Sequence, residues 1–331
     1  MVRAREQWIE RLRDLLERAG FYVANTQGVR PSSFDLAARR DATLLLIKVL
    51  KNIDALDSEE ASRLRELGRL FPAIVLVVGQ TSGAAALDEG VVYTRYEVPI
   101  VTEGTLRDYL EKAVPPFLYA SPGGSFAHID GERLRFLRQA RGLSLGALAQ
   151  IAGVSRRAIQ LYEEGQGAEA TVVERIEAYL DAPVVRAIDL FEGPRRLRIP
   201  APGNDVADER ERRAEAPAPV PRTGDPLRDG VLAQLGDMGL EVTITVRAPF
   251  DALARMPEIL LAGVGSLRTA VHRAEVLHGI ARVAEGHAMF IVREDVHRPS
   301  IGGLAILTVR ELRRHRDPDE LLEEITEREG P

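Results

Sequence analysis

The sequence predicts a multidomain chain in which a small all-α module lies between two α/β domains. Three observations predict this architecture. Capped amphipathic helical segments fill residues 128–192, and a common order of helix and strand patterns occurs in residues 1–120 and again in residues 227–327. A proline-rich stretch, residues 193–226, separates the all-α module from the second α/β region. With 331 residues, the chain is long enough for two or three domains of about 100–200 residues each.

The composition restricts the classes of protein to which the chain can belong. The net charge is −6, so any contact with nucleic acid must come from local basic patches. The absence of cysteine excludes disulfides and thiolate metal sites and fits a cytoplasmic protein. The N-terminus has no signal pattern, and no apolar run approaches the ~20 residues needed to span a membrane. We therefore expect a cytoplasmic protein with no membrane partner.

The first α/β domain, residues 1–120, begins with an amphipathic helix over residues 6–19 that Gly20 ends. The runs at 44–50 and 73–78 are almost wholly apolar, which is typical of central strands covered on both faces. The remaining expected elements are strands at 21–24, 34–38, 91–93 and 99–101 and helices at 58–70 and 105–112. Prolines and glycines between residues 115 and 124 predict a boundary before the all-α module.

Two consecutive helices inside the all-α module are marked by their caps. Ser144 occupies an N-cap position, where its side chain can accept a hydrogen bond from a backbone N–H. Gly153 lies where that helix should end in a left-handed conformation. Ser155 then caps the next helix, and Ile159 is its apolar anchor. The spacing leaves polar side chains on the first turns of this helix: Arg156, Arg157 and Gln160.

The module resembles the lambda-repressor-like, Cro-type helix-turn-helix family. The resemblance covers the lead-in Arg141-Gly142-Leu143-Ser144, the exit Tyr162-Glu163-Glu164-Gly165, and residues 171–180 and 184–191, which resemble helices four and five. It implies a five-helix module that binds double-stranded DNA, with the start of the second helix of the motif in the major groove. Leu145 departs from the pattern, because family members often carry a phosphate-binding Gln there. The residues expected at the DNA are Ser144, Ser155, Arg156, Arg157, Gln160, Arg138 and Arg141.

An alternative for the same module is a helical bundle that binds protein rather than DNA. Charge favours DNA, because residues 130–160 contain six arginines and two acidic residues, a net charge of +4.

The proline-rich stretch has no apolar period, so we expect residues 193–226 to be a flexible linker. Beyond it, the stretch Phe250-Asp251-Ala252-Leu253-Ala254-Arg255 matches Phe34-Asp35-Leu36-Ala37-Ala38-Arg39 of the first α/β domain. Expected elements at 227–239, 259–264, 267–284, 288–292, 302–308 and 309–312 follow the order of the first domain. This order predicts a duplicated α/β domain.

The order helix, three strands, helix, strand resembles the restriction-endonuclease-like fold. The resemblance implies a metal site made of an Asp at a strand start and an (Asp/Glu)-x-Lys sequence on the next strand. Asp35 and Lys48 fit, but Leu46 replaces the second acid. In the second copy Asp251 fits the first position, whereas Val264 is matched to Lys48. One carboxylate is too few to hold Mg²⁺, so both copies are expected to be degenerate, with no catalytic residues and no metal.

Asp35 and Lys48 in the first copy and Asp251 in the second are thus candidates for the remains of a nuclease site. We call these three residues the relic site. Asp35 and Asp251 could instead serve only to close a turn by hydrogen bonding to nearby backbone. Gly263 and Gly265 form an isolated Gly-x-Gly without the rest of a dinucleotide fingerprint, and we expect no cofactor.

With the stretches Phe34–Arg39, Leu45–Asp54 and Gly302-Gly303, the chain resembles archaeal transcriptional regulators of similar length that carry a central Cro-type helix-turn-helix. The resemblance covers nearly the whole chain except for the proline-rich stretch. The resemblance implies a regulator assigned by its DNA-binding module, with flanking domains of unestablished role. We expect a sequence-specific DNA-binding regulator, not an enzyme, that forms a homodimer and uses its α/β domains for assembly or sensing. The alternative is a nuclease-related DNA-processing or defence protein, active or inactive. The sequence specifies neither an operator nor an effector.

Overall fold

The structure is a computed structural model that describes residues 2–29, 32–192, 223–255, 258–294, 296 and 298–329. These residues form two compact units. The first unit contains the chain up to Val49, the segment Ser62–Val75 and the C-terminal α/β domain. The second contains Leu50–Ala61 and the chain from Leu76 through the helix-turn-helix module. Most of the predicted linker, residues 193–222, lies outside the described residues.

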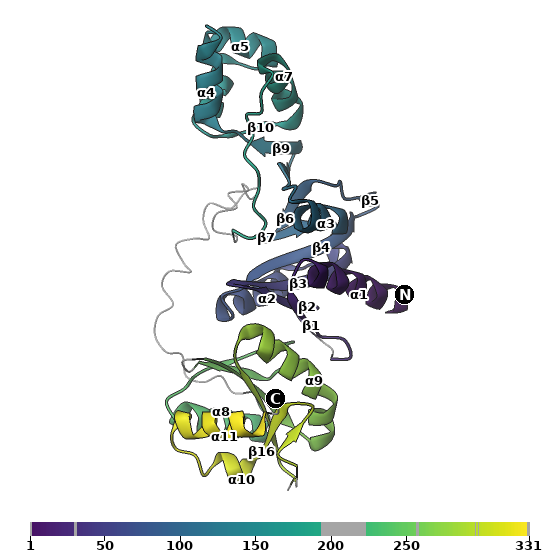
Figure 1. Ribbon diagram of the computed structural model, residues 1–331, viewed down its shortest axis with the longest axis vertical. Coiled ribbons are helices and arrows are strands. Elements are labelled where there is room, and N and C mark those ends of the chain that lie inside the picture. The colour runs from purple at the N-terminus through teal and green to yellow at the C-terminus, as the bar shows by residue number, and fades with distance from the viewer. Residues whose placement is uncertain are drawn as a thin grey trace. The chain divides into compact units, whose positions relative to one another are not determined.

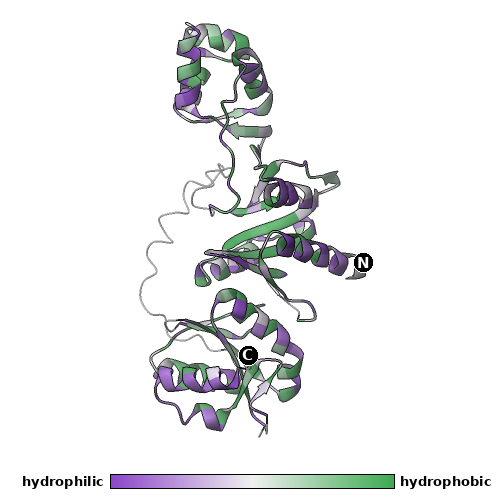
Figure 2. Cartoon of the chain, viewed as in Figure 1, coloured by the Kyte–Doolittle hydropathy of each residue, from purple (hydrophilic) through white to green (hydrophobic). Residues whose placement is uncertain are grey.

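The N-terminal α/β domain is built on a mixed sheet (Figure 1). Its strands are β1 (Tyr22–Asn25), β2 (Leu36–Arg40), β3 (Thr43–Asn52), β4 (Ile74–Ser82), β5 (Ala85–Ala86), β6 (Val91–Arg95) and β7 (Val98–Val101). The strand order is β1-β2-β3-β4-β7-β6, with β5 paired to β4. β1, β2 and β3 are antiparallel neighbours, whereas β7 runs parallel to β4 and antiparallel to β6. The predicted central strands are therefore present, and both are strongly hydrophobic (Figure 2).

Three α-helices accompany this sheet: α1 (Val2–Arg18), α2 (Ser58–Leu70) and α3 (Glu103–Lys112). A short 3₁₀ helix, η1 (Ile53–Ala55), follows β3. Helix α1 packs against β1 and β2 through its apolar face, where Trp8, Ile9, Leu12, Leu15 and Leu16 are all buried. Gly20, with φ +84°, ends the helix as its sequence position predicts.

The C-terminal α/β domain repeats the strand arrangement of the first. Its strands are β11 (Glu241–Ile244), β12 (Ala252–Arg255), β13 (Ile259–Gly265), β14 (His287–Val292), β15 (Ser300–Ile301) and β16 (Leu304–Thr308). Their order, β11-β12-β13-β14-β16-β15, reproduces β1-β2-β3-β4-β7-β6 strand for strand. The register agrees as well, because Leu36 lies opposite Ile47 and Ala252 lies opposite Ala262. We call these two domains the repeats.

The helices of the C-terminal repeat are α8 (Pro226–Asp237), α9 (Leu267–Ala284), α10 (Val309–Leu312) and α11 (Pro318–Arg328). α8 takes the place of α1, and α9 takes the place of α2 as the helix between the third and fourth strands. The core between α8, α10, α11 and the sheet is aliphatic and includes Leu232, Leu235, Leu260, Leu321 and Ile325. α11 was not predicted from the sequence.

The all-α module contains α4 (Gly131–Ala140), α5 (Leu145–Ala152), α6 (Arg156–Glu163) and α7 (Ala170–Leu180). The predicted fifth helix at 184–191 is wrong. This segment is extended: Val185 forms a β-bridge with Ile129, and the Arg186 N–H donates to the His128 carbonyl. Pro183 and the β-branched pair that follows it favour this extended path over a helix.

The predicted boundary at residues 115–124 is a β-hairpin. Strands β8 (Leu118–Ser121) and β9 (Gly124–His128) pair around a turn at Pro122 and Gly123, and β10 (Gly167–Glu169) adds to β9. The strand order continues from β6 through β8 and β9 to β10. The module is therefore joined to the preceding domain by paired strands rather than by a loop alone. Among the described helices, none has the length and apolar character required to cross a bilayer.

A histidine held between two carboxylates gives the C-terminal repeat a specific pH dependence. His287 Nδ1 lies 2.7 Å from Glu329 and Nε2 lies 2.7 Å from Glu258, so both ring nitrogens can donate only in the protonated imidazole. Burial alone would lower the pKa of His287, but the hydrogen bonds with Glu329 and Glu258 outweigh it and raise the pKa above 6.5.

We expect His287→Gln to lower the melting temperature of the protein at about pH 6 and to have a smaller effect above about pH 8. The native state binds the extra proton, so this stabilisation is complete below the unfolded pKa and is lost as the pH rises through the folded pKa. Melting curves of the wild type and the variant between pH 5.5 and 8.5 test this. A difference that grows with pH would contradict it.

Candidate nucleic-acid interface

Helices α5 and α6 form the predicted capped pair. The Ser144 hydroxyl accepts a hydrogen bond from the Ala147 N–H at 3.1 Å, and the Ser155 hydroxyl accepts one from the Ala158 N–H at 3.1 Å. Gly153 takes the left-handed conformation, with φ +70°, between the two helices. The apolar side of the pair is buried with α4 and α7 in one core that includes Ile159.

The opposite side of α6 presents three of the predicted residues to solvent. Arg156, Arg157 and Gln160 are exposed and follow directly after the Ser155 cap. Within the described part of the chain, neither arginine side chain has a hydrogen-bond or ion-pair partner. The Gln160 amide donates to Glu164 at 3.1 Å, one turn later on an exposed surface. The start of α6 therefore presents to solvent the positive charges of Arg156 and Arg157 and the side-chain amide of Gln160.

Arg138 does not belong to this exposed group. It is only 9% exposed, and its guanidinium donates to both carboxylate oxygens of Glu163 and to the Leu143 carbonyl. Its donors are used inside the module to join α4 to the end of α6. The prediction that Arg138 contacts DNA is not supported by this geometry, because the side chain is already paired and buried.

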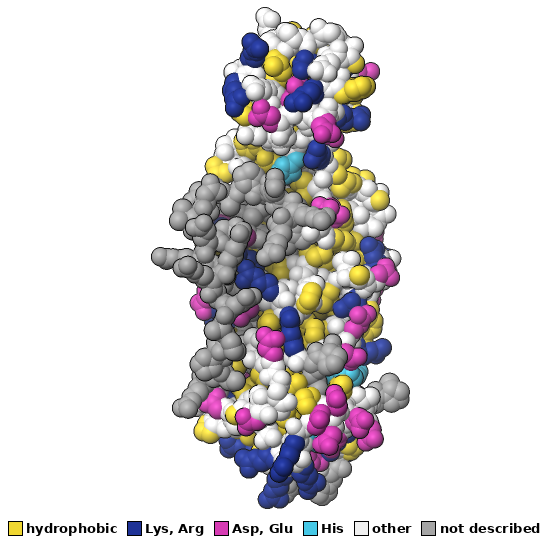
Figure 3. All heavy atoms as spheres, turned by 90° about the vertical axis from the view of Figure 1, so that its left-hand side faces the viewer, with side chains coloured by type: hydrophobic (Ala, Val, Ile, Leu, Met, Phe, Trp, Pro, Cys, Tyr) yellow, Lys and Arg dark blue, Asp and Glu magenta, His cyan; other side chains and the backbone are white. Residues whose placement is uncertain are grey.

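The net charge of +4 in residues 130–160 therefore overstates the free basic surface. Glu163 neutralises Arg138 and also lies 3.3 Å from Arg135, and the Arg133 side chain donates to the Pro183 carbonyl. Arg141, by contrast, remains exposed at the end of α4. Arg side chains are visible on the helix-turn-helix part of the face in Figure 3, interspersed with acidic ones.

Leu145 is the position at which the Cro-type pattern often has a phosphate-binding Gln. Its side chain is partly buried and packs against the core of the module. Its role here is therefore packing at the start of α5.

Asp35 is buried at the entrance to β2, as expected for the relic site, and a cation lies beside it. Its carboxylate accepts hydrogen bonds from the Val49 N–H at 2.8 Å and from Arg5 of α1 at 2.8 Å. Arg5 also donates to the Val49 carbonyl at 3.0 Å. In an active nuclease this carboxylate would bind the metal ion. Here the Arg5 guanidinium supplies the positive charge beside it instead.

Asp251 has an equivalent environment in the C-terminal repeat. Its carboxylate accepts a hydrogen bond from the Val264 N–H at 2.8 Å and pairs with Arg228 of α8 at 3.0 Å and with Arg273 of α9 at 3.4 Å. In both repeats an arginine from the first helix neutralises the aspartate. Each aspartate also fixes the third strand through a backbone N–H, which agrees with the structural alternative for these residues.

This alignment corrects the predicted equivalence of Lys48 and Val264. Because Asp35 binds Val49 and Asp251 binds Val264, Val49 matches Val264 and Lys48 matches Gly263. A Cβ added to Gly263 would lie 2.4 Å from the Phe290 ring, so the second repeat has no room for a side chain there. Lys48 is itself buried, and its ammonium donates to the Ser32 carbonyl at 2.9 Å.

Among the described residues, no group of three or more His, Asp or Glu side chains is placed to hold a metal ion. In the relic site, Asp35 is paired with Arg5, and Asp251 is paired with Arg228 and Arg273. The roles of Arg5, Arg228 and Arg273 were not predicted from the sequence, although the helical spacing of these residues places them on the side that faces the sheet.

Comparison with known proteins supports both parts of this description. The PD-(D/E)XK superfamily domain matches residues 5–116, and a helix-turn-helix domain family matches residues 131–187. No solved structure matches the chain.

Archaeal relatives match almost the whole chain. A protein of Methanocella arvoryzae is 37% identical over 331 residues, covering 98% of this chain and 97% of the relative. A protein of Halorubrum lacusprofundi is 35% identical over 330 residues, covering 98% of each chain, and one of Natronomonas pharaonis is 36% identical over 318 residues, covering 95% of each. All three are named "Putative HTH-type transcriptional regulatory protein". The chain belongs to this family of archaeal HTH-type transcriptional regulatory proteins, which confirms the resemblance inferred from the sequence.

Proposed function

We propose that the protein is a cytoplasmic, sequence-specific regulator that binds double-stranded DNA through α6 and does not cleave it. The single observation that carries the proposal is the exposed group of Arg156, Arg157 and Gln160 on the first turns of α6. Side chains at this place in a helix-turn-helix reach base edges in the major groove. Arg can donate two hydrogen bonds to guanine, and Gln can form a bidentate pair with adenine.

Contacts to the phosphate backbone complete the interface in this proposal. Ser144 and Ser155 lie at the two helix N-termini, where backbone N–H groups favour an anion. Arg141 at the end of α4 adds a flexible positive charge. These contacts would position the module on DNA, and Arg157 and Gln160 would select the sequence.

The non-catalytic role of the repeats is supported by the arginines beside Asp35 and Asp251. A carboxylate that is already paired with a guanidinium gains little from Mg²⁺, and Leu46 supplies no second ligand. We propose that the repeats serve assembly or sensing. A homodimer that holds two helix-turn-helix modules on two half-sites remains a prediction.

We expect Gln160→Ala and Arg157→Ala each to weaken binding to the preferred sequence by ~1–3 kcal/mol and to relax base preference at one or two positions. Selection of bound sequences from a random DNA pool, followed by titration of the preferred site, measures both effects. Arg314→Ala is the matched control, because Arg314 is exposed in the C-terminal repeat. Unchanged affinity and selectivity in both α6 variants would refute the role of α6.

The same DNA incubated with the wild type and Mg²⁺ should remain intact. Cleavage by the wild type that Asp35→Ala abolishes would show that the nuclease-related alternative is correct.

A further inference from the structure

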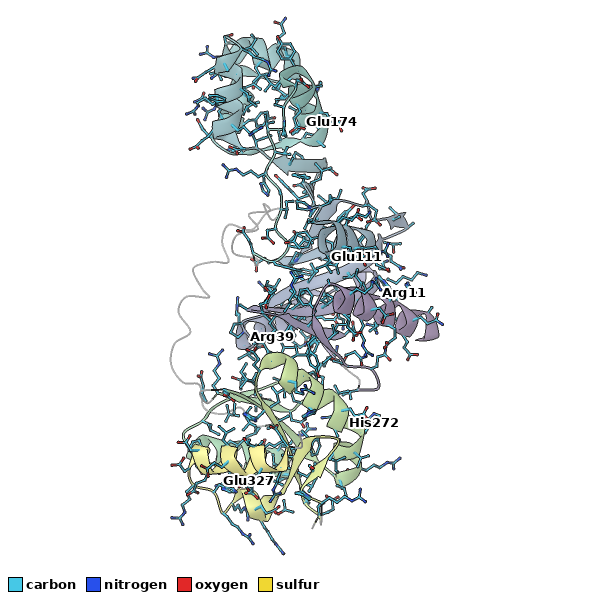
Figure 4. All side chains as sticks on the ribbon, viewed as in Figure 1. Arg11, Arg39, Glu111, Glu174, His272 and Glu327 are labelled. Carbon is cyan, nitrogen blue, oxygen red and sulfur yellow. The ribbon has the colours of Figure 1, made fainter. Side chains whose placement is uncertain are left out.

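Within the first compact unit, the two repeats contact each other. The contacts are made by elements that occur in both repeats, namely the helix between the third and fourth strands and the strands at the start of the sheet. Helix α9 of the C-terminal repeat lies against β1 and β2 of the N-terminal repeat (Figure 1). The approach is close, because a Cβ added to Gly279 of α9 would lie 3.3 Å from the Cβ of Ala24 in β1. His272, which is labelled in Figure 4, belongs to the same helix, and its Nε2 atom lies 2.8 Å from the carbonyl oxygen of Gly28.

Two equivalent arginines, one in each repeat, bind the end of a helix in the other repeat. Arg39 of β2 donates to the carbonyls of Val283 and Ala284, the last two residues of α9, at 2.6 and 3.5 Å. Arg255 of β12 donates to the carbonyls of Arg69 and Leu70, the last two residues of α2, at 3.5 and 3.2 Å.

Arg39 and Arg255 are also the final residues of the two matched six-residue stretches. Each repeat therefore places the same arginine on the same end of the equivalent helix in the other repeat.

The loops that precede these stretches also meet. The Ser33 N–H donates to the Arg247 carbonyl at 2.6 Å, joining the loop before β2 to the loop before β12. Next to it, Phe250 packs edge-on against Phe71, which follows α2, with ring centroids 5.7 Å apart. Contacts between equivalent segments, made in both directions, are the property of an interface with two-fold symmetry.

We propose that the two repeats form an internal pair with approximate two-fold symmetry, held by Arg39 and Arg255. A single repeat would use the same face to form a homodimer, and in this chain the other repeat occupies that face. The last carbonyls of a helix have no partner in the helix and carry the negative end of its dipole. A guanidinium satisfies both needs, since it offers several donors and a positive charge. A second copy of this chain must then associate through another surface.

The two arginines should contribute unequally. Arg39 is partly buried and also pairs with Glu285 at 3.1 Å, whereas Arg255 is exposed. Hydrogen bonds from a charged donor are stronger where water is excluded. Loss of Arg39 should therefore weaken the pairing about tenfold and loss of Arg255 about threefold.

The absence of cysteine from the chain permits a direct test on the full-length protein. In the variant Ala24→Cys with Gly279→Cys, the two Cβ atoms are close enough for a disulfide. We expect the disulfide to form within one chain, giving a monomer with altered mobility on a non-reducing gel. The matched control, Ala24→Cys with Gly279→Ser, keeps the added bulk at position 279 and shows whether the fold tolerates it.

Equilibration of the A24C/G279C protein with a glutathione redox buffer then gives the effective concentration of the two thiols. Arg39→Ala should lower it about tenfold, and Arg314→Ala should leave it unchanged. A disulfide that joins two chains, or the absence of one in a folded protein, would overturn the internal pairing. Equal values for Arg39→Ala and Arg314→Ala would overturn the role of the arginines. None of these outcomes depends on whether α6 binds DNA.

Discussion

Arg138→Ala should strongly destabilise the helix-turn-helix module and leave the two repeats folded. The substitution removes the main counter-charge of Glu163, whose side chain is 5% exposed. Breaking a buried ion pair by deleting one partner costs ~3–5 kcal/mol, because the remaining charge stays buried and unpaired. Arg135 lies 3.3 Å from the same carboxylate and is half exposed, so we expect the lower end of that range, about 3 kcal/mol.

Hydrogen exchange measured by mass spectrometry can locate this loss, since the amides of α4 and α6 should lose protection while those of β3 and β13 keep it. Arg141→Ala is the matched control on the same module, because Arg141 is exposed and should change stability by less than about 0.5 kcal/mol. Replacing Arg138 and Glu163 together with leucine should restore most of the stability. Equal protection in the Arg138 and Arg141 variants would show that the pair contributes nothing.

Asp35→Ala should produce the second large effect, again on stability. It leaves the buried N–H of Val49 without its acceptor and Arg5 without its carboxylate. An unsatisfied buried donor together with a lost charged partner costs ~2–4 kcal/mol. Chemical denaturation measures this loss, and the fluorescence of Trp8, which is buried on α1 beside this strand pair, reports it directly.

Two comparisons separate this structural role of Asp35 from metal binding. Asp251→Ala should cost less, because Asp251 is 11% exposed and its side chain is reached more easily by water. Mg²⁺ should leave the melting temperature of the wild type unchanged. A rise in melting temperature with Mg²⁺ that disappears in Asp35→Ala would show that Asp35 holds a metal ion after all.

Local sequence signals predicted those parts of the fold that depend on neighbouring residues. The serine caps and Gly153 define α5 and α6 because capping is decided within three or four residues. The apolar runs identified β3 and β4, and the matched six-residue stretches identified β2 and β12. Comparison confirmed the predicted nuclease-like domain at the N-terminus and the helix-turn-helix domain.

Contacts between distant parts of the chain account for the errors. The helix expected at 184–191 came from the family resemblance, whereas Val185 in this segment pairs with Ile129, more than fifty residues earlier. The charge of Arg138 suggested a DNA contact, whereas its partner Glu163 lies 25 residues ahead in a different helix. Arg5 was overlooked for the same reason, since its proximity to Asp35 depends on how α1 packs on the sheet.

The contact between the repeats also determines when the N-terminal repeat can finish folding during synthesis. Ala24 and Phe71 are covered partly by residues as late as Gly279 and Phe250, and the carbonyl that Arg39 binds belongs to Val283. At ~5–20 residues per second, a ribosome that has made Phe71 needs roughly 10–40 s more to reach Val283. During that interval the face of β1 and the ring of Phe71 are open to other nascent chains. The helix-turn-helix module, whose Asp189 binds Tyr109 about 80 residues earlier, can be complete well before the N-terminal repeat is covered.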